Sequence, residues 1–208
     1  MNSTLYRGLE LLLLFVLIPV SFVFKYSPWI KLGIGVVGFL YVIYVLLKVE
    51  HLKFKIVKHL NWTLFWKETF IKLSLIAVIT FIFVWVSNKE ALFQVVYNKP
   101  KLWLLILFIY SVFSVYPQEL IYRTFFFSRY RNLFKNNNVF LFINAILFSL
   151  AHLFFRNALV IVLTFLGGLL FALTYNKTQS TILVSIEHAV YGCWLFTVGM
   201  GVMLGFPA

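Results

Sequence analysis

Long apolar blocks, separated by short stretches rich in basic and polar residues, make up nearly the whole chain. A helix needs about 20 mostly apolar residues to cross the hydrocarbon core of a bilayer. The pattern therefore predicts an all-α fold, a polytopic transmembrane helical bundle of about seven spans, within a range of six to eight. The predicted spans cover residues 9–24, 29–47, 70–86, 102–127, 138–155, 157–175 and 181–205.

Three positions qualify this pattern. The first block begins beside Glu10, which we expect to reach the membrane interface, and no small-residue cleavage site follows it, so a retained span is expected. The fourth block is too long for one straight crossing and contains Pro117, which predicts a kink or a break. The fifth and sixth blocks meet at Arg156 and Asn157, which predicts a very tight turn.

Composition supports the membrane class. Of the 208 residues, 62% are hydrophobic and 12% are charged, and the mean hydropathy is +0.96. Soluble domains are about half apolar and about a quarter charged. Neither a polar linker nor a repeat interrupts the pattern, so we expect a single membrane domain over residues 1–208.

The charge is strongly basic, at +12, with 18 Lys and Arg against six acids. Because these bases lie mostly between apolar blocks, their expected partners are anionic lipid headgroups, and nucleic acid is not expected. With seven spans, ten bases fall on the N-terminal side and six on the other. The positive-inside rule then places the N-terminus in the cytoplasm and the chain in the cell (inner) membrane.

Ionisable side chains within a span are costly, and they usually mark a functional site. Three groups lie in the C-terminal half: Gln118, Glu119 and Arg123; Asn144, Phe148 and His152; Ser185, Glu187, His188 and Gly192. Glu119 and Arg123 are four residues apart and can pair. Each group also has a purely structural interpretation, as a self-neutralising ion pair or as a buried histidine. Lys72, near the start of its span, can reach the interface, and we assign it no role.

The residue types suit hydrolysis in an internal, water-accessible cavity. A carboxylate or histidine can accept a proton from attacking water, and a second histidine can hydrogen-bond the oxyanion. Neither serine nor cysteine stands in a nucleophile motif, so water is the expected nucleophile and no cofactor is expected. The competing use is a zinc site of two histidines and one glutamate, although a His-Glu-x-x-His motif is missing.

In this order, the residues resemble the CAAX protease and bacteriocin-processing (Abi) family of intramembrane proteases, which includes type II CAAX prenyl endopeptidases. The family motifs are Glu-Glu-x-x-x-Arg, Phe-x-x-x-His and His-x-x-x-Asn. The corresponding stretches here are Gln118-Glu119-x-x-x-Arg123, Phe148-x-x-x-His152 and His188-x-x-x-Gly192. The resemblance covers about residues 100–206 and implies a helical bundle that cleaves peptide bonds near the membrane.

The resemblance also implies roles. Gln118 occupies the position of the family's base, with His152 as its partner, while His188 serves the oxyanion and Glu119 and Arg123 form a supporting pair. Two positions depart from the family. A neutral amide at Gln118 is a poor proton acceptor, and Gly192 brings no side chain where the family has an amide donor.

These departures leave three functions open. The leading interpretation is an intramembrane endopeptidase in which Glu119 and His152 activate water and His188 stabilises the oxyanion. Its substrate would be a peptide or a membrane protein. The alternative is a catalytically silent relative that acts as an immunity or scaffold protein. A small transporter or channel is the third interpretation, since intramembrane Glu, Arg and His also suit proton relays.

Overall fold

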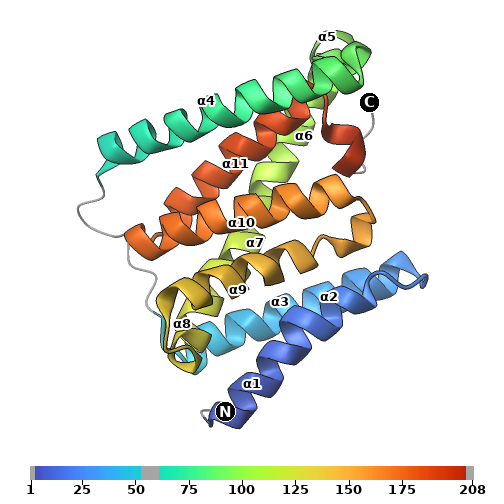
Figure 1. Ribbon diagram of the computed structural model, residues 1–208. Helices are drawn as coiled ribbons and strands as arrows, with labels where there is room; N and C mark the ends of the chain where they lie inside the picture. The colour runs from blue at the N-terminus through green and yellow to red at the C-terminus, as the bar shows by residue number, and fades with distance from the viewer. Residues whose placement is uncertain (1–2, 53–60, 205–208) are drawn as a thin grey trace. The chain divides into compact units, whose positions relative to one another are not determined.

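A computed structural model describes residues 3–52 and 61–204, and these form helices joined by short connections (Figure 1). Seven helical runs among them are long and apolar enough to cross a membrane, which confirms the all-α polytopic fold and the predicted number of spans. The runs are Thr4–Ser21, Pro28–Lys48, Trp62–Ser87, Pro100–Leu133, Asn137–Phe155, Ala158–Thr178 and Thr181–Val198.

Short 3-10 or π-helical turns, labelled η, interrupt the α-helices. In chain order the elements are α1 (Thr4–Leu12), η1 (Leu13–Leu17), α2 (Ile18–Ser21), α3 (Pro28–Lys48), α4 (Trp62–Ser87), η2 (Lys89–Ala91), α5 (Gln94–Asn98), α6 (Pro100–Ile109), η3 (Tyr110–Val115), α7 (Tyr116–Glu119), η4 (Leu120–Phe125), α8 (Phe126–Tyr130), η5 (Arg131–Leu133), α9 (Asn137–Leu150), η6 (Leu153–Phe155), α10 (Ala158–Thr178), α11 (Thr181–Val198) and η7 (Gly201–Leu204).

The chain divides into two compact units. Unit 1 comprises the described parts of Met1–Ile56 and Gln118–Gln179, and unit 2 comprises those of Val57–Pro117 and Ser180–Ala208. The sequence predicted a kink or a break at Pro117, and the helical run Pro100–Leu133 does not break there. Instead, π-helical turns precede and follow α7, the short helix that contains the proline. Wider turns of this kind commonly accommodate a missing backbone donor.

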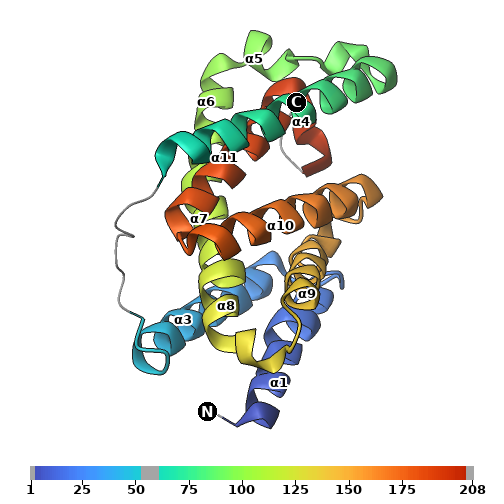
Figure 2. The ribbon, with the colours of Figure 1, turned by 60° about the vertical axis from the view of Figure 1, so that its left-hand side comes forward.

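In unit 1, α9 and α10 lie side by side (Figures 1 and 2). The turn between them is as tight as predicted, because Arg156 adopts a left-handed conformation with a φ of 53° and Asn157 caps α10. A Cβ added at Gly168 would lie 3.1 Å from the Cα of Ala145. Glycine at this position therefore lets the two backbones approach closely, as small residues do in membrane helix pairs.

In unit 2, α11 packs along α4 (Figure 2). An indole N–H needs an acceptor in apolar surroundings, and the Trp194 N–H donates to the Thr80 hydroxyl across this contact at 2.9 Å. The seventh span ends at Val198, so the predicted extension to residue 205 is wrong. The reason is Gly199, which ends the helix with a φ of +109°.

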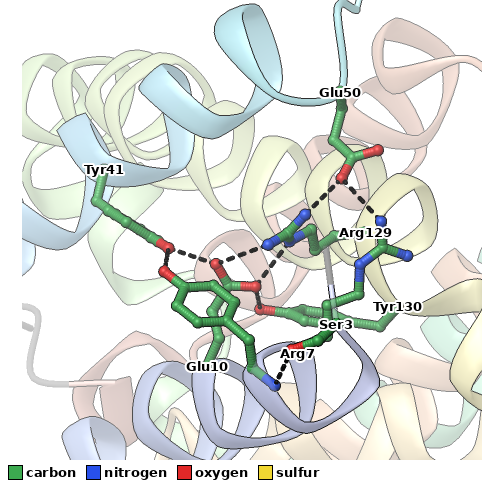
Figure 3. A network of polar contacts seen from close by, with 8 residues as sticks. Ser3, Arg7, Glu10, Tyr41, Glu50, Arg129 and Tyr130 are labelled. Carbon is green, nitrogen blue, oxygen red and sulfur yellow. Dashed lines mark hydrogen bonds and ion pairs between the residues drawn. The ribbon is translucent and has the colours of Figure 1, made fainter. Parts of the chain in front are cut away.

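A buried polar network joins α1, α3 and α8 in unit 1 (Figure 3). Arg129 is fully buried, and its guanidinium lies 2.7 Å from one oxygen of Glu10 and 2.8 Å from Glu50. The hydroxyls of Tyr41 and Tyr130 also donate to Glu10. Glu10, expected from the sequence to reach the interface, is buried in this network and pairs with a cation far along the chain.

We predict that Arg129→Met will strongly destabilise unit 1. Removing one partner of a buried ion pair leaves an uncompensated charge, which typically costs about 3–5 kcal/mol. The effect is measured as a loss of thermal stability of the purified protein in detergent micelles. The matched control is Lys135→Met, which removes an exposed cation nearby and should leave the transition unchanged. Equal transitions for the two variants would contradict a stabilising role for the network.

Candidate active site

Arg123 is the centre of the polar contacts on η4 in unit 1. Its side chain is fully buried, and its Nε lies 3.2 Å from Glu119 Oε2, so the ion pair predicted from the i,i+4 spacing is present. The guanidinium also donates to the side-chain oxygen of Asn144 and, at 3.3 Å, to the carbonyl of Gly168. The Phe148 ring lies 5.0 Å from the guanidinium carbon. These contacts hold the charge in one place.

Asn144 completes this arrangement from α9. It is fully buried, and its amide group donates to the carbonyl of Tyr122 at 2.8 Å while its oxygen accepts from Arg123. Each end of the amide therefore has a partner on η4. Asn144 and Phe148, four residues apart on α9, both contact Arg123 and so lie on one face of that helix.

His152 lies just beyond the end of α9 and is half-buried. Its Nδ1 is 2.8 Å from the carbonyl oxygen of Phe148. A carbonyl oxygen can only accept a hydrogen bond, so Nδ1 carries the proton in the neutral imidazole and Nε2 has a free electron pair. The ring also packs against Phe148 and stacks on Phe155. This tautomer suits a proton acceptor.

Gln118 and Glu119 are neighbours on α7 with different surroundings. Gln118 is half-exposed, whereas Glu119 is fully buried beside Arg123. Successive side chains on a helix point about 100° apart. The carboxylate and the amide therefore face different directions, and Glu119 does not stand in the place of Gln118.

In unit 2, Glu187 faces α4. Its Oε1 accepts from Lys72 Nζ at 2.7 Å and from the Tyr191 hydroxyl at 2.9 Å. Glu187 is fully buried. Lys72 thus pairs with a buried carboxylate on another helix, a contact that the sequence did not predict. Spacing along the chain offered no signal for this pair, whose members are 115 residues apart.

His188 lies on another face of α11 and is 7% exposed. The ring of Tyr110, on η3 of the same unit, meets the imidazole edge-on with centroids 6.0 Å apart. A Cβ built on Gly192, one turn after His188, would lie 2.1 Å from the Tyr110 hydroxyl. The sequence did not predict a role for Tyr110. The signal that could have found it is Gly192, whose lack of a side chain leaves space for a residue from a neighbouring helix.

The predicted site residues fall into two sets. Unit 1 holds Gln118, Glu119 and Arg123 and also His152, with the Phe148 ring touching both Arg123 and His152. Unit 2 holds His188. The convergence of all five on one wet cavity stays a prediction. Among the residues that the structure describes, no three His, Cys, Asp or Glu side chains gather as metal ligands would.

The described residues thus form a seven-span helical chain with a buried Glu–Arg pair and two histidines within the spans. Comparison with known proteins gives one match. Residues 100–194 match the family model described as type II CAAX prenyl endopeptidase Rce1-like. The resemblance drawn from the three motifs is thereby confirmed for this part of the chain, which is an integral membrane protein. No curated protein and no solved structure matches the chain.

We predict that Asn144→Leu will loosen this part of unit 1, because it leaves the Tyr122 carbonyl and one Arg123 N–H without their partner. An unsatisfied buried polar group costs about 1–3 kcal/mol, and more when it is charged. The change is measured as a loss of thermal stability in micelles. Asn138→Leu, at an exposed position of the same helix, is the control. A variant as stable as the wild type would show that Arg123 does not depend on Asn144.

Proposed function

We propose that this protein is an intramembrane endopeptidase that hydrolyses a peptide bond with an activated water. The observation that carries the proposal is the hydrogen bond between His152 Nδ1 and the Phe148 carbonyl. It leaves Nε2 of a half-buried histidine ready to accept a proton from water. The match of residues 100–194 to a family of prenyl endopeptidases supports the same reaction.

The contacts divide the roles among the residues of unit 1. His152 takes the proton at Nε2, the ring nitrogen that carries no proton in the tautomer set by the Phe148 carbonyl. Glu119 is fully buried against Arg123, which suits a pair that holds the helix turn carrying Gln118 in place. Direct activation of water by Glu119 stays a prediction from the sequence, and Glu119→Gln tests it.

In unit 2, His188 supplies a hydrogen bond to the oxyanion of the tetrahedral intermediate. Its imidazole is nearly buried on α11, and preorganised donors in such surroundings stabilise developing charge strongly. The reaction is metal-free in this proposal, and zinc is the alternative that chelator treatment would reveal. The substrate is a peptide or a membrane protein whose cleavage site reaches these histidines from the lipid phase.

We predict that His152→Ala will lower kcat about 10²–10⁴-fold, and that His188→Ala will lower it about 10²–10³-fold. The assay uses the full chain in lipid vesicles with internally quenched peptides. One set is farnesylated at a cysteine four residues from the C-terminus, and a matched set carries no lipid. His51→Asn is the control, because His51 is exposed outside the spans and has a φ of 50° that asparagine tolerates.

The double variant sharpens this test. Residues that act in one transition state are non-additive, so His152→Ala combined with His188→Ala should lose little more than the worse single variant. Multiplied losses would show that the two histidines do not act together. Wild-type kcat in both single variants would remove the proposed reaction.

A silent relative, acting as an immunity or scaffold protein, is the second candidate because Gln118 is a neutral amide. The Gln118→Glu variant separates it from a protease in the same vesicles and peptide panel. Turnover by the wild type favours the enzyme. Turnover that arises only in Gln118→Glu favours the silent relative.

For the orientation, we infer that the N-terminus lies in the cytoplasm. Arg129 is paired with Glu10 and Glu50 and is left out of the charge count. Nine Lys and Arg residues then remain on the N-terminal side of the membrane, against six on the other side. With seven spans the C-terminus then lies on the far side. A C-terminal reporter that is active only outside the cytoplasm should be active in intact cells. Activity of that reporter only when fused to the N-terminus would reverse the topology.

A further inference from the structure

The Tyr110 side chain occupies the space beside Gly192, where a side chain at position 192 would lie. A Cβ on Gly192 would lie 2.1 Å from the Tyr110 hydroxyl and 2.4 Å from its ring carbons. Real Cβ atoms essentially never approach heavy atoms so closely, so any side chain at position 192 requires the tyrosine ring to shift. The hydroxyl therefore stands where a side chain at position 192 would begin.

The tyrosine ring is held in this position from both sides. His188, Gly192 and Phe196 are each four residues apart, so they share one face of α11. The Tyr110 ring meets Phe196 at 4.8 Å and 77°, and it meets His188 at 6.0 Å and 81°. Both are edge-to-face contacts of the favourable kind. Packing against α11 thus aims the hydroxyl at the turn that carries the histidine.

We propose that the Tyr110 hydroxyl is a second hydrogen-bond donor to the oxyanion, beside His188 and in the space that Gly192 leaves open. The proposal rests on the hydrolase function proposed above. Side chains four apart on a helix have their Cβ atoms about 5–6 Å apart. A hydroxyl at position 192 and an imidazole at position 188 are therefore close enough to bond one oxygen between them.

The chemistry needs no other reactant. Water attacks the peptide carbonyl carbon, a C–O bond forms, and the carbonyl π electrons move to the oxygen. The water proton passes to His152 Nε2. Tyr110 and His188 donate hydrogen bonds to the new oxyanion and keep their protons. When the intermediate collapses, the C–N bond breaks and the leaving amine takes the proton from His152.

The decisive variant is Tyr110→Phe, which keeps the ring and its packing on Phe196 and removes only the donor. We expect kcat to fall about 10²–10³-fold, as for the loss of one oxyanion donor, with KM changed less than about threefold. The assay uses the full chain in vesicles with the farnesylated, internally quenched peptide. Tyr116→Phe, an exposed tyrosine on the same helical run, is the matched control and should keep wild-type kcat.

A double exchange tests the shared space independently. Gly192→Asn alone should lose activity because it collides with the tyrosine. Combined with Tyr110→Ala, the asparagine has room, and its amide can donate in place of the hydroxyl. We expect the double variant to exceed Tyr110→Ala at least tenfold in kcat. This rescue would not follow if the ring only filled space.

The outcomes separate the two proposals. An active wild type with Tyr110→Phe within about threefold of it in kcat overturns the role of Tyr110 and leaves the hydrolase standing. A change in KM alone also overturns it, since that indicates substrate binding. A wild type that turns over no peptide, while His188→Ala changes nothing, overturns the hydrolase and this role with it.

Discussion

The positive charge on Arg123 is the constraint around which unit 1 is organised. A guanidinium out of contact with water has to be neutralised and hydrogen-bonded, or it costs several kcal/mol. Glu119 supplies the charge, and oxygens of Asn144 and Gly168 supply further acceptors. These partners come from α7, α9 and α10. One cation therefore specifies how three segments meet, and Gly168 allows the close approach that brings its carbonyl within reach.

The same rule accounts for the other acids inside the spans. Glu10 pairs with Arg129, and Glu187 pairs with Lys72. Each buried carboxylate thus has its own cation from within its unit. Against this balance, the neutral amide at Gln118 has a physical consequence. A carboxylate at position 118 would add a negative charge at a half-exposed position, next in sequence to the buried Glu119–Arg123 pair.

Much of this structure follows from local pattern. Features that depend on residues close together in the sequence could be predicted. They are the seven apolar blocks, the Glu119–Arg123 spacing and the Arg156–Asn157 turn. Contacts between distant segments could not be predicted from such local patterns. Glu10 and Arg129 are 119 residues apart, Lys72 and Glu187 are 115 apart, and neither pairing was predicted. Hydropathy gives the length of a span, but it does not show which side chains of that span contact a neighbouring helix.

The candidate site shows the same limit at closer range. Position 192 could be recognised as a departure from the family, and a glycine there suggested a lost donor. The structure changes that interpretation, because the space is occupied by a hydroxyl from η3. Tyr110 and Gly192 lie on separate helical segments, so no helical spacing in the sequence could have placed this tyrosine opposite Gly192. When a helix lacks a side chain at one position, a neighbouring helix can place its own side chain in the space and supply the missing functional group.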